Sequence, residues 1–257
     1  MCSVVRIDLN AELGRGLDEA WGELEAGFWP LLSSVAIPCG GHAGEPATML
    51  ATAATAGSRG IAVGAALGYR DSQGRGQRYV EDDADSLAAD LLYQLGGLDA
   101  LVAGEAGALG FVRPSGSLAE AVVANRSHAW AIVNAVLDFD PTLVVVGPAD
   151  SLLLATASRH GLRVASEVEP RRNGAGGPLS TDPAEIAARA VVAAERTEAT
   201  LLHLGCRNSA DLTVARAVRA ALEQAGCSIG SLVDAPATAS PETPPRTASR
   251  WTWQPRS

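Results

Sequence analysis

A single histidine, His42, stands among three glycines in residues 37–46, where an apolar run ends and an Ala/Thr-rich segment begins. Glycines let the backbone adopt unusual dihedrals and approach a ligand closely. Pro46 suits the first turn of a following helix, where its missing N–H would be unpaired anyway. The stretch therefore predicts either a strand-to-helix turn that presents a titratable group to a site, or a tight turn whose histidine bonds a nearby carbonyl.

Apolar runs and helical periodicity alternate along the whole chain around this stretch. Strands are expected at residues 4–9, 33–37, 61–65, 110–112, 143–146, 162–165 and 200–203. Helices are expected at 17–32, 46–58, 85–103, 118–137, 151–159, 183–196 and 210–225. This alternation predicts an α/β fold with a parallel sheet and right-handed crossovers. Seven evenly spaced strands favour a closed barrel, with a doubly wound open sheet as the alternative.

Polar residues follow the predicted strands, and in both architectures a site lies beyond the carboxyl ends of the strands. That rule gathers on one face Asp8, Asn10, Glu12, His42, residues 68–78, Arg113, Ser115, Glu167 and His203. The charged residues of the glycine-rich 68–78 loop, Asp71, Arg75 and Arg78, are expected to be solvated.

Composition limits the class of protein. With 257 residues, 47% of them hydrophobic, the chain can bury a sizeable core, and its net charge of −9 argues against nucleic acid or an anionic membrane as partner. No apolar run reaches the roughly 18 residues of a membrane span, and the N-terminus has no signal-peptide layout. The four cysteines lack CxxC spacing, which is typical of reduced thiols in the cytoplasm. We expect one domain over residues 1–232 and a disordered Pro/Ser/Thr-rich tail over 233–257.

Several motifs together resemble one known family. Residues 7–16 (IDLNAELGRG) resemble the opening IDLNxDLGEG of the LamB/YcsF family, whose best-understood members are the A subunit of bacterial 5-oxoprolinase. Residues 36–46 (AIPCGGHAGEP) are similar to its NIACGFHAGDP, residues 61–71 (IAVGAALGYRD) to VAIGAHPGYPD, and residues 112–118 (VRPSGSL) to VKPHGAL. The matches keep the same order from about residue 4 to 225, so the chain is identified as a member.

The resemblance implies a seven-stranded (β/α) barrel of the glycoside hydrolase/deacetylase type. It also implies ATP-dependent hydrolytic opening of 5-oxoproline to glutamate together with two partner subunits. The chain has no G-x-x-x-x-G-K-[ST] phosphate loop, so ATP is expected to be bound with or by those partners. Whether the chain also forms a homo-oligomer is left open.

Some family positions carry other residues here. Ala66 and Ser115 stand where the family has histidine, Arg113 where it has lysine, and Ala36 where it has asparagine. A catalytic zinc site normally has three protein ligands, and two obvious ones are replaced, so no metal site is expected.

The resemblance assigns proton transfer to Asp8 and His42. It assigns substrate binding to Asn10, Glu12, Gly44, Arg113 and Ser115, with Arg113 able to fork onto a carboxylate. Because the replaced positions cluster on one face, the alternative is a catalytically degenerate paralogue that binds a small carboxylate or regulates another protein.

Overall fold

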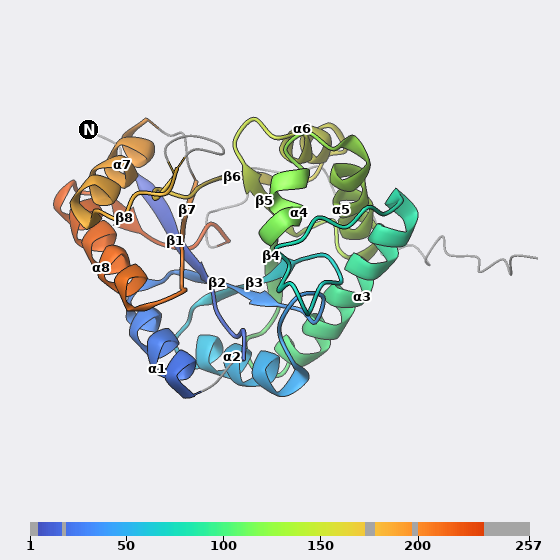
Figure 1. The fold of residues 1–257 in the computed structure, drawn as a ribbon, viewed down its shortest axis with the longest axis horizontal. Coiled ribbons are helices and arrows are strands. Elements are labelled where there is room, and N and C mark those ends of the chain that lie inside the picture. Colours follow the sequence, from blue (N-terminus) through green and yellow to red (C-terminus); the bar gives the residue numbers. More distant parts are fainter. Residues whose placement is uncertain (1–4, 17–18, 173–177, 197–199, 234–257) are drawn as a thin grey trace, which may run out of the picture.

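The protein is described by a computed structural model at residues 5–16, 19–172, 178–196 and 200–233. Strands and helices alternate as the periodicity predicts (Figure 1). The strands are β1 (Arg6–Glu12), β2 (Ser34–Pro38), β3 (Ala62–Leu67), β4 (Leu109–Pro114), β5 (Val144–Pro148), β6 (Val164–Val168), β7 (Leu201–Leu204) and the short β8 (Ser228–Ile229). The helices are α1 (Glu19–Phe28), α2 (Pro46–Ser58), α3 (Ala84–Val102), α4 (Gly116–Ala121), α5 (Arg126–Phe139), α6 (Leu152–Arg159), α7 (Pro183–Glu195) and α8 (Ser209–Gln224), with a 3-10 turn at Trp29–Leu31.

Strands β1 to β7 pair in sequence order and close into a barrel. Every neighbouring pair is parallel, and β1 pairs with both β2 and β7, which closes the ring. The helices surround this ring (Figure 1). The seven-stranded parallel barrel is thus confirmed, and the open sheet is excluded. We call the end where the strands terminate the mouth, and the opposite end the floor.

Two apolar regions hold the barrel together. The larger one lies between strands and helices. A smaller cluster contains Ala36, Ala66, Phe111, Val144, Val146, Ala165 and Leu201. The Phe111 ring leaves no room for a side chain at Gly64 on β3, since a Cβ there would lie 2.3 Å from the ring. The apolar cluster therefore fills part of the barrel, and the polar groups described below occupy the rest.

Among the element boundaries that differ from the sequence prediction, two depend on polar side chains. The first strand was expected to end at residue 9, but β1 continues to Glu12, because its polar residues find partners inside the barrel. The single helix expected at 118–137 is two helices: Asn125 breaks it and caps α5 by accepting a hydrogen bond from the backbone N–H of His128 (3.2 Å).

The end of the described chain returns to the floor of the barrel. Strand β8, which the sequence pattern did not predict, pairs with Arg6 and Ile7 at the start of β1. After two intervening residues, Leu232 and Val233 pack against the smaller apolar cluster. The disordered tail was expected at 233–257; its first residue, Val233, is instead packed on the barrel, and residues 234–257 lie outside the described residues.

Two chemical expectations can be compared with the described residues. Cys39, Cys206 and Cys227 are free thiols, as their spacing predicts, while Cys2 lies outside the described ranges. Among the helices of the described chain, none combines the length and apolar character needed to cross a membrane.

Candidate functional site

Strand β1 carries three polar side chains at alternating positions. Asp8, Asn10 and Glu12 are all buried, with exposed fractions of 1%, 0% and 6%, while the apolar residues between them pack in the main core. Successive side chains of a strand point to opposite faces. Strand β1 therefore lays a line of polar groups inside the barrel, from near the floor to the mouth.

Asp8 lies in the first half of β1, not at the strand end where the sequence placed it. Its carboxylate accepts hydrogen bonds from the hydroxyls of Ser33 (2.6 Å) and Ser34 (2.8 Å) and from the backbone N–H of Leu232 (2.9 Å). Burial raises the pKa of Asp8 above its ordinary value, although these hydrogen bonds oppose the shift. Asp8 thus ties β2 and the C-terminal segment to β1, and the proton-transfer role expected for it stays a prediction.

Asn10 lies between the floor and the mouth and contacts both neighbouring strands. Its amide donates to Ser34 Oγ (2.8 Å), and its Oδ1 lies 3.2 Å from Nδ1 of His203 on β7. Asn10 also stands opposite both residues in the strand register. Burial, with the nearby charge of Arg113, lowers the pKa of His203 well below its ordinary value. His203 is therefore neutral at physiological pH.

Glu12 is the centre of the buried polar cluster at the mouth. Its Oε2 accepts a hydrogen bond from the hydroxyl of Ser115 (2.5 Å), and its Oε1 accepts one from Nε of Arg15 (2.9 Å) and lies 3.2 Å from Nε2 of His42. Burial opposes ionisation of Glu12, but the bond to His42 and the charges of Arg15 and Arg113 outweigh it and hold its pKa well below the ordinary value. Glu12 is therefore a carboxylate at neutral pH.

Arg113 on β4 is bound on two sides by carboxylates. Its Nε and Nη2 contact the two oxygens of Glu167 on β6, the second at 3.0 Å, and its Nη1 lies 3.7 Å from Oε2 of Glu12. The side chains of Arg113 and Glu167 are each 9% exposed. The positive charge of Arg113 is thus neutralised inside the protein. The predicted binding of a substrate carboxylate by Arg113 stays a prediction.

His42 is held by the glycine-rich turn between β2 and α2. Gly44 has a φ of +86°, and a Cβ there would lie 2.0 Å from the carbonyl oxygen of Pro38, so the turn requires glycine. The bond of the His42 ring is to the carboxylate of Glu12, not to a carbonyl, and its Nδ1 is buried without a hydrogen-bond partner among the described residues. The expected alternative, a bond from His42 to a nearby carbonyl, is therefore not observed, and the role of this turn in a site stays a prediction. Asp8, the other residue expected to transfer protons, has partners other than His42.

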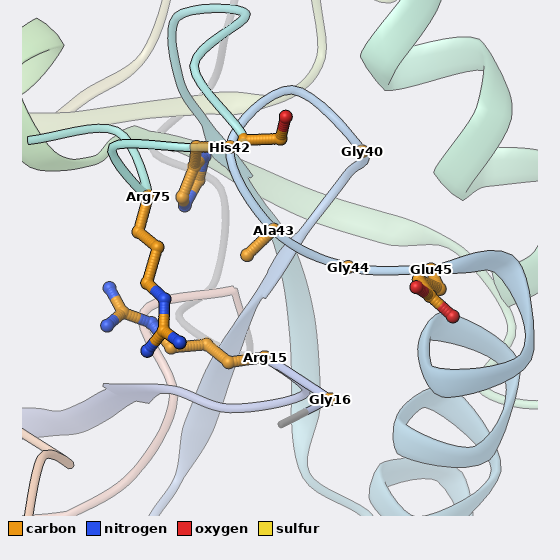
Figure 2. Close-up of a pocket in the computed structure, with 9 residues that line it drawn as sticks. Arg15, Gly16, Gly40, His42, Ala43, Gly44, Glu45 and Arg75 are labelled. Atoms are coloured by element: carbon orange, nitrogen blue, oxygen red, sulfur yellow. The ribbon is translucent and has the colours of Figure 1, made fainter. Parts of the chain in front are cut away.

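A pocket of about 250 Å³ opens beside this turn (Figure 2). It is lined by Arg15, Gly16, Gly40, His42, Ala43, Gly44, Glu45, Ser72 and Arg75. The side chains of Arg15 and Arg75 point toward the same part of the pocket, and Glu45 lies at its other end, at the start of α2 (Figure 2). His42, which contacts the buried carboxylate of Glu12, therefore lines a small cavity that two arginine side chains also line.

Sequence reasoning missed part of this lining. Arg15 and Arg75 were not among the predicted site residues, although Arg15 follows Glu12 by three positions, a signal for a local ion pair. Asp71, expected to be solvated, is 4% exposed; it accepts hydrogen bonds from the backbone N–H of Gly74 (3.0 Å) and from Nε of Arg78 (2.9 Å). Asp71 fixes the shape of the loop that carries Arg75.

The replaced family positions have structural consequences. Ala66 and Ala36, on neighbouring strands, belong to the smaller apolar cluster and leave no polar group there. Within the described ranges, no three or more His, Cys, Asp or Glu side chains come together in a way that could hold a metal ion. Arg113 and Ser115, by contrast, both contact the Glu12 cluster.

The sequence is similar to a defined family over most of its length. A model described as the LamB/YcsF family matches residues 7–236. The A subunit of 5-oxoprolinase from Mycolicibacterium gilvum (strain PYR-GCK) is 40% identical over 162 residues, which are 63% of this chain and 64% of that protein. The A subunit of 5-oxoprolinase from Mycobacterium avium (strain 104) is 38% identical over 204 residues, which are 74% and 79% of the two chains.

Solved structures agree with the fold. The lactam utilization protein of Thermus thermophilus is 34% identical with a TM-score of 0.81, over 88% of this chain and 99% of that one. The catalytic domain of a peptidoglycan N-acetylglucosamine deacetylase from Eubacterium rectale has a TM-score of 0.51 at 10% identity, over 91% of each chain. The second likeness concerns the fold alone and confirms a barrel of the deacetylase type.

Proposed function

Because this chain belongs to the LamB/YcsF family, we propose that it is the A subunit of a 5-oxoprolinase. It opens the lactam of 5-oxoproline to glutamate by ATP-dependent hydrolysis, in a cytoplasmic complex with partner subunits. The observation that carries this proposal is the buried pair of Glu12 and His42 beside a small pocket at the mouth of the barrel. Relatives that bear the name of the 5-oxoprolinase A subunit support it at 36–40% identity.

His42 and Glu12 can supply the proton transfers of such a reaction. Hydrolysis adds water to the lactam carbonyl carbon and breaks the C–N bond, so a proton leaves the water and one arrives at the ring nitrogen. In this proposal His42 takes the first proton and returns the second. The Glu12 carboxylate, 3.2 Å from Nε2, stabilises the imidazolium that exists between the two transfers.

The other predicted site residues shape and support this centre. Ser115 and Arg113 hold Glu12 as a carboxylate, Asn10 orders β1 against His203, and Gly44 gives the pocket its wall. Asp8, nearer the floor, accepts a hydrogen bond from Ser34 and so fixes β2, the strand that leads into the turn of His42. The lactam oxygen needs activation near neutral pH, and ATP, bound with or by the partner subunits, is the proposed source.

A reconstitution assay tests the proposal. The chain is co-expressed with candidate partner subunits, and glutamate release from 5-oxoproline is measured with and without ATP. We expect ATP-dependent release that His42→Ala abolishes, while the control His160→Ala, an exposed histidine at the end of α6, keeps it. Asp8→Ala is compared in parallel. Activity unaffected by both His42→Ala and Asp8→Ala would refute the assignment.

The same assay separates the alternative of a binding or regulatory module. The lost histidines at Ala66 and Ser115 motivate that alternative. Saturable binding of 5-oxoproline without turnover, with every partner combination tried, would favour it over catalysis.

A further inference from the structure

The arginines at the mouth of the barrel differ in how many acidic partners they have. Arg113 is bound by Glu167 and lies near Glu12, so a ligand carboxylate would have to compete with two buried acids. Arg75 lines the pocket and, within the described chain, has no acidic side chain in ion-pair contact. The Arg75 guanidinium can therefore bind an anionic ligand without first breaking an ion pair with a carboxylate of the described residues.

The 68–78 loop holds Arg75 in a strained backbone conformation. Arg75 has a φ of +53°, a left-handed conformation that an L-residue other than glycine seldom adopts. The conformation is held from both sides: the backbone N–H of Arg75 donates to Ser72 (3.3 Å), and that of Gly76 donates to Asp71 (3.0 Å). Strained backbone that its surroundings maintain is often found at ligand-binding positions. Here it directs a cationic side chain to the pocket (Figure 2).

Arg15 adds a second positive charge. It donates through Nε to Glu12, while its Nη groups have no hydrogen-bond partner in the described part of the chain. Arg15 stands where the family's opening motif IDLNxDLGEG has a glutamate, which is a reversal of charge at the pocket wall. Like charges that point toward one region repel each other, and an anion between Arg15 and Arg75 would relieve that repulsion (Figure 2).

The size of the cavity limits the anion. About 250 Å³ is below the roughly 300–1,000 Å³ of sites for drug-sized ligands, so the pocket suits a small acid better than a whole nucleoside triphosphate. A carboxylate is planar and matches the two-pronged geometry of a guanidinium. An acid held at Arg15 and Arg75 would place the rest of the molecule along the wall that contains His42.

We propose that Arg15 and Arg75 form a carboxylate-binding subsite, and that this subsite, not Arg113, holds the carboxylate of the small cyclic substrate. The inference rests on the proposed function for the identity of that substrate. A hydrogen bond to a charged partner accounts for about tenfold to hundredfold in affinity. Loss of either arginine should weaken binding of the acid by that factor.

Titration calorimetry on the full chain tests the subsite without partner subunits. The ligands are 5-oxoproline, 2-pyrrolidinone (the same lactam without the carboxylate) and inorganic phosphate. The variant is Arg75→Gln. The matched control is Arg70→Gln, which removes the same charge from the same loop, where Arg70 is 75% exposed and pairs with Asp90. Thermal unfolding of both variants checks that the fold is intact.

We expect 5-oxoproline to bind about tenfold to hundredfold more weakly to Arg75→Gln than to the wild type or to Arg70→Gln, and 2-pyrrolidinone to compete poorly. Equal affinity of Arg75→Gln and wild type overturns the subsite, as does equal competition by 2-pyrrolidinone or the absence of any Arg75-dependent binding. Phosphate binding that depends on Arg75, combined with 5-oxoproline binding that does not, assigns the arginines to a phosphoryl group and overturns the carboxylate assignment.

This outcome is separate from that of the proposed function. If the reconstituted complex releases glutamate and Arg75→Gln leaves its KM unchanged, the subsite is refuted while the function stands. If the complex is inactive but Arg75-dependent binding of 5-oxoproline is measured, the subsite stands and the catalytic function fails.

Discussion

Replacing Glu12 by glutamine removes one buried negative charge and keeps the shape of the side chain. The carboxylate accepts hydrogen bonds from Ser115 and Arg15, contacts His42, and faces Arg113 at 3.7 Å. A glutamine can keep accepting through its Oε1, but its amide presents a donor where the carboxylate presented an acceptor. The substitution therefore breaks the charge balance of the cluster without opening a cavity.

The expected loss of stability is large for a single substitution. Hydrogen bonds to a charged group contribute about 1.5–3 kcal/mol each, and removal of one partner of a buried ion pair costs about 3–5 kcal/mol. Relief of the desolvation of Glu12 offsets part of this loss, so we expect a decrease near the lower end, about 3 kcal/mol. For a domain of this size that corresponds to a fall in Tm of roughly 6–12 °C.

Urea unfolding monitored by tryptophan fluorescence measures this loss in the free energy of unfolding. Glu120→Gln is the matched control, because Glu120 is 73% exposed and its contact with Arg172 is 3.9 Å long. We expect Glu120→Gln to change the free energy of unfolding by less than about 0.5 kcal/mol. The pKa of Glu12 is lowered, so the carboxylate stabilises the fold above about pH 4.5. The difference between wild type and Glu12→Gln should therefore be constant above that pH and shrink as the pH falls further, toward the pKa of folded Glu12.

Two results would refute the reasoning. The first is a free energy of unfolding for Glu12→Gln within about 0.5 kcal/mol of the wild type at pH 7, which would mean that the cluster contributes no net stability. The second is simple additivity with Ser115→Ala. Groups in contact should show a coupling free energy of about 0.5–3 kcal/mol in a double-mutant cycle.

Three further predictions concern other parts of the barrel. Below pH 6.5 the lowered pKa keeps folded His203 neutral while the unfolded chain binds a proton, so the wild type should lose up to about 1.4 kcal/mol of unfolding free energy per pH unit. His203→Gln should make this loss smaller, which urea titrations at several pH values can measure. Parallel pH profiles of the two proteins would contradict this. Gly44→Ala should lower the free energy of unfolding by more than about 2 kcal/mol, because of the positive φ and the clash with Pro38. Gly97→Ala should raise it by about 0.5–1 kcal/mol, because a Cβ at this position of α3 meets no atom within 4 Å beyond its chain neighbours and the backbone of its own helix. Equal thermal shifts of the two variants would be inconsistent with both arguments. We also propose that the barrel domain needs only the residues up to 233: a chain ending there should unfold like the full chain, and one ending at 227 should lose stability through the missing β8 and Leu232, which circular dichroism can compare.

The sequence alone determined the local structure and its order. The periodicity of two and of 3.6 residues is a property of consecutive residues, so the seven strands and most helices could be read from it; α2 begins at Pro46, as the preference for proline at a first helical turn predicts. Motifs of the LamB/YcsF type indicated the family, and the rule for parallel sheets placed Glu12, His42, Arg113 and Ser115 at one end of the barrel. These inferences need no knowledge of distances.

The tertiary structure decided which of those residues touch. Ser115 is 103 positions from Glu12, and His42 is 30 positions from it; contacts over such separations depend on barrel closure and strand register, which no local pattern encodes. Asp8 received serine and backbone partners near the floor because β1 extends three residues further than its apolar run. Arg75 came to the pocket through a left-handed turn held by Asp71. Pairing of distant groups is a property of the closed barrel, and it made Glu12 the centre of the site.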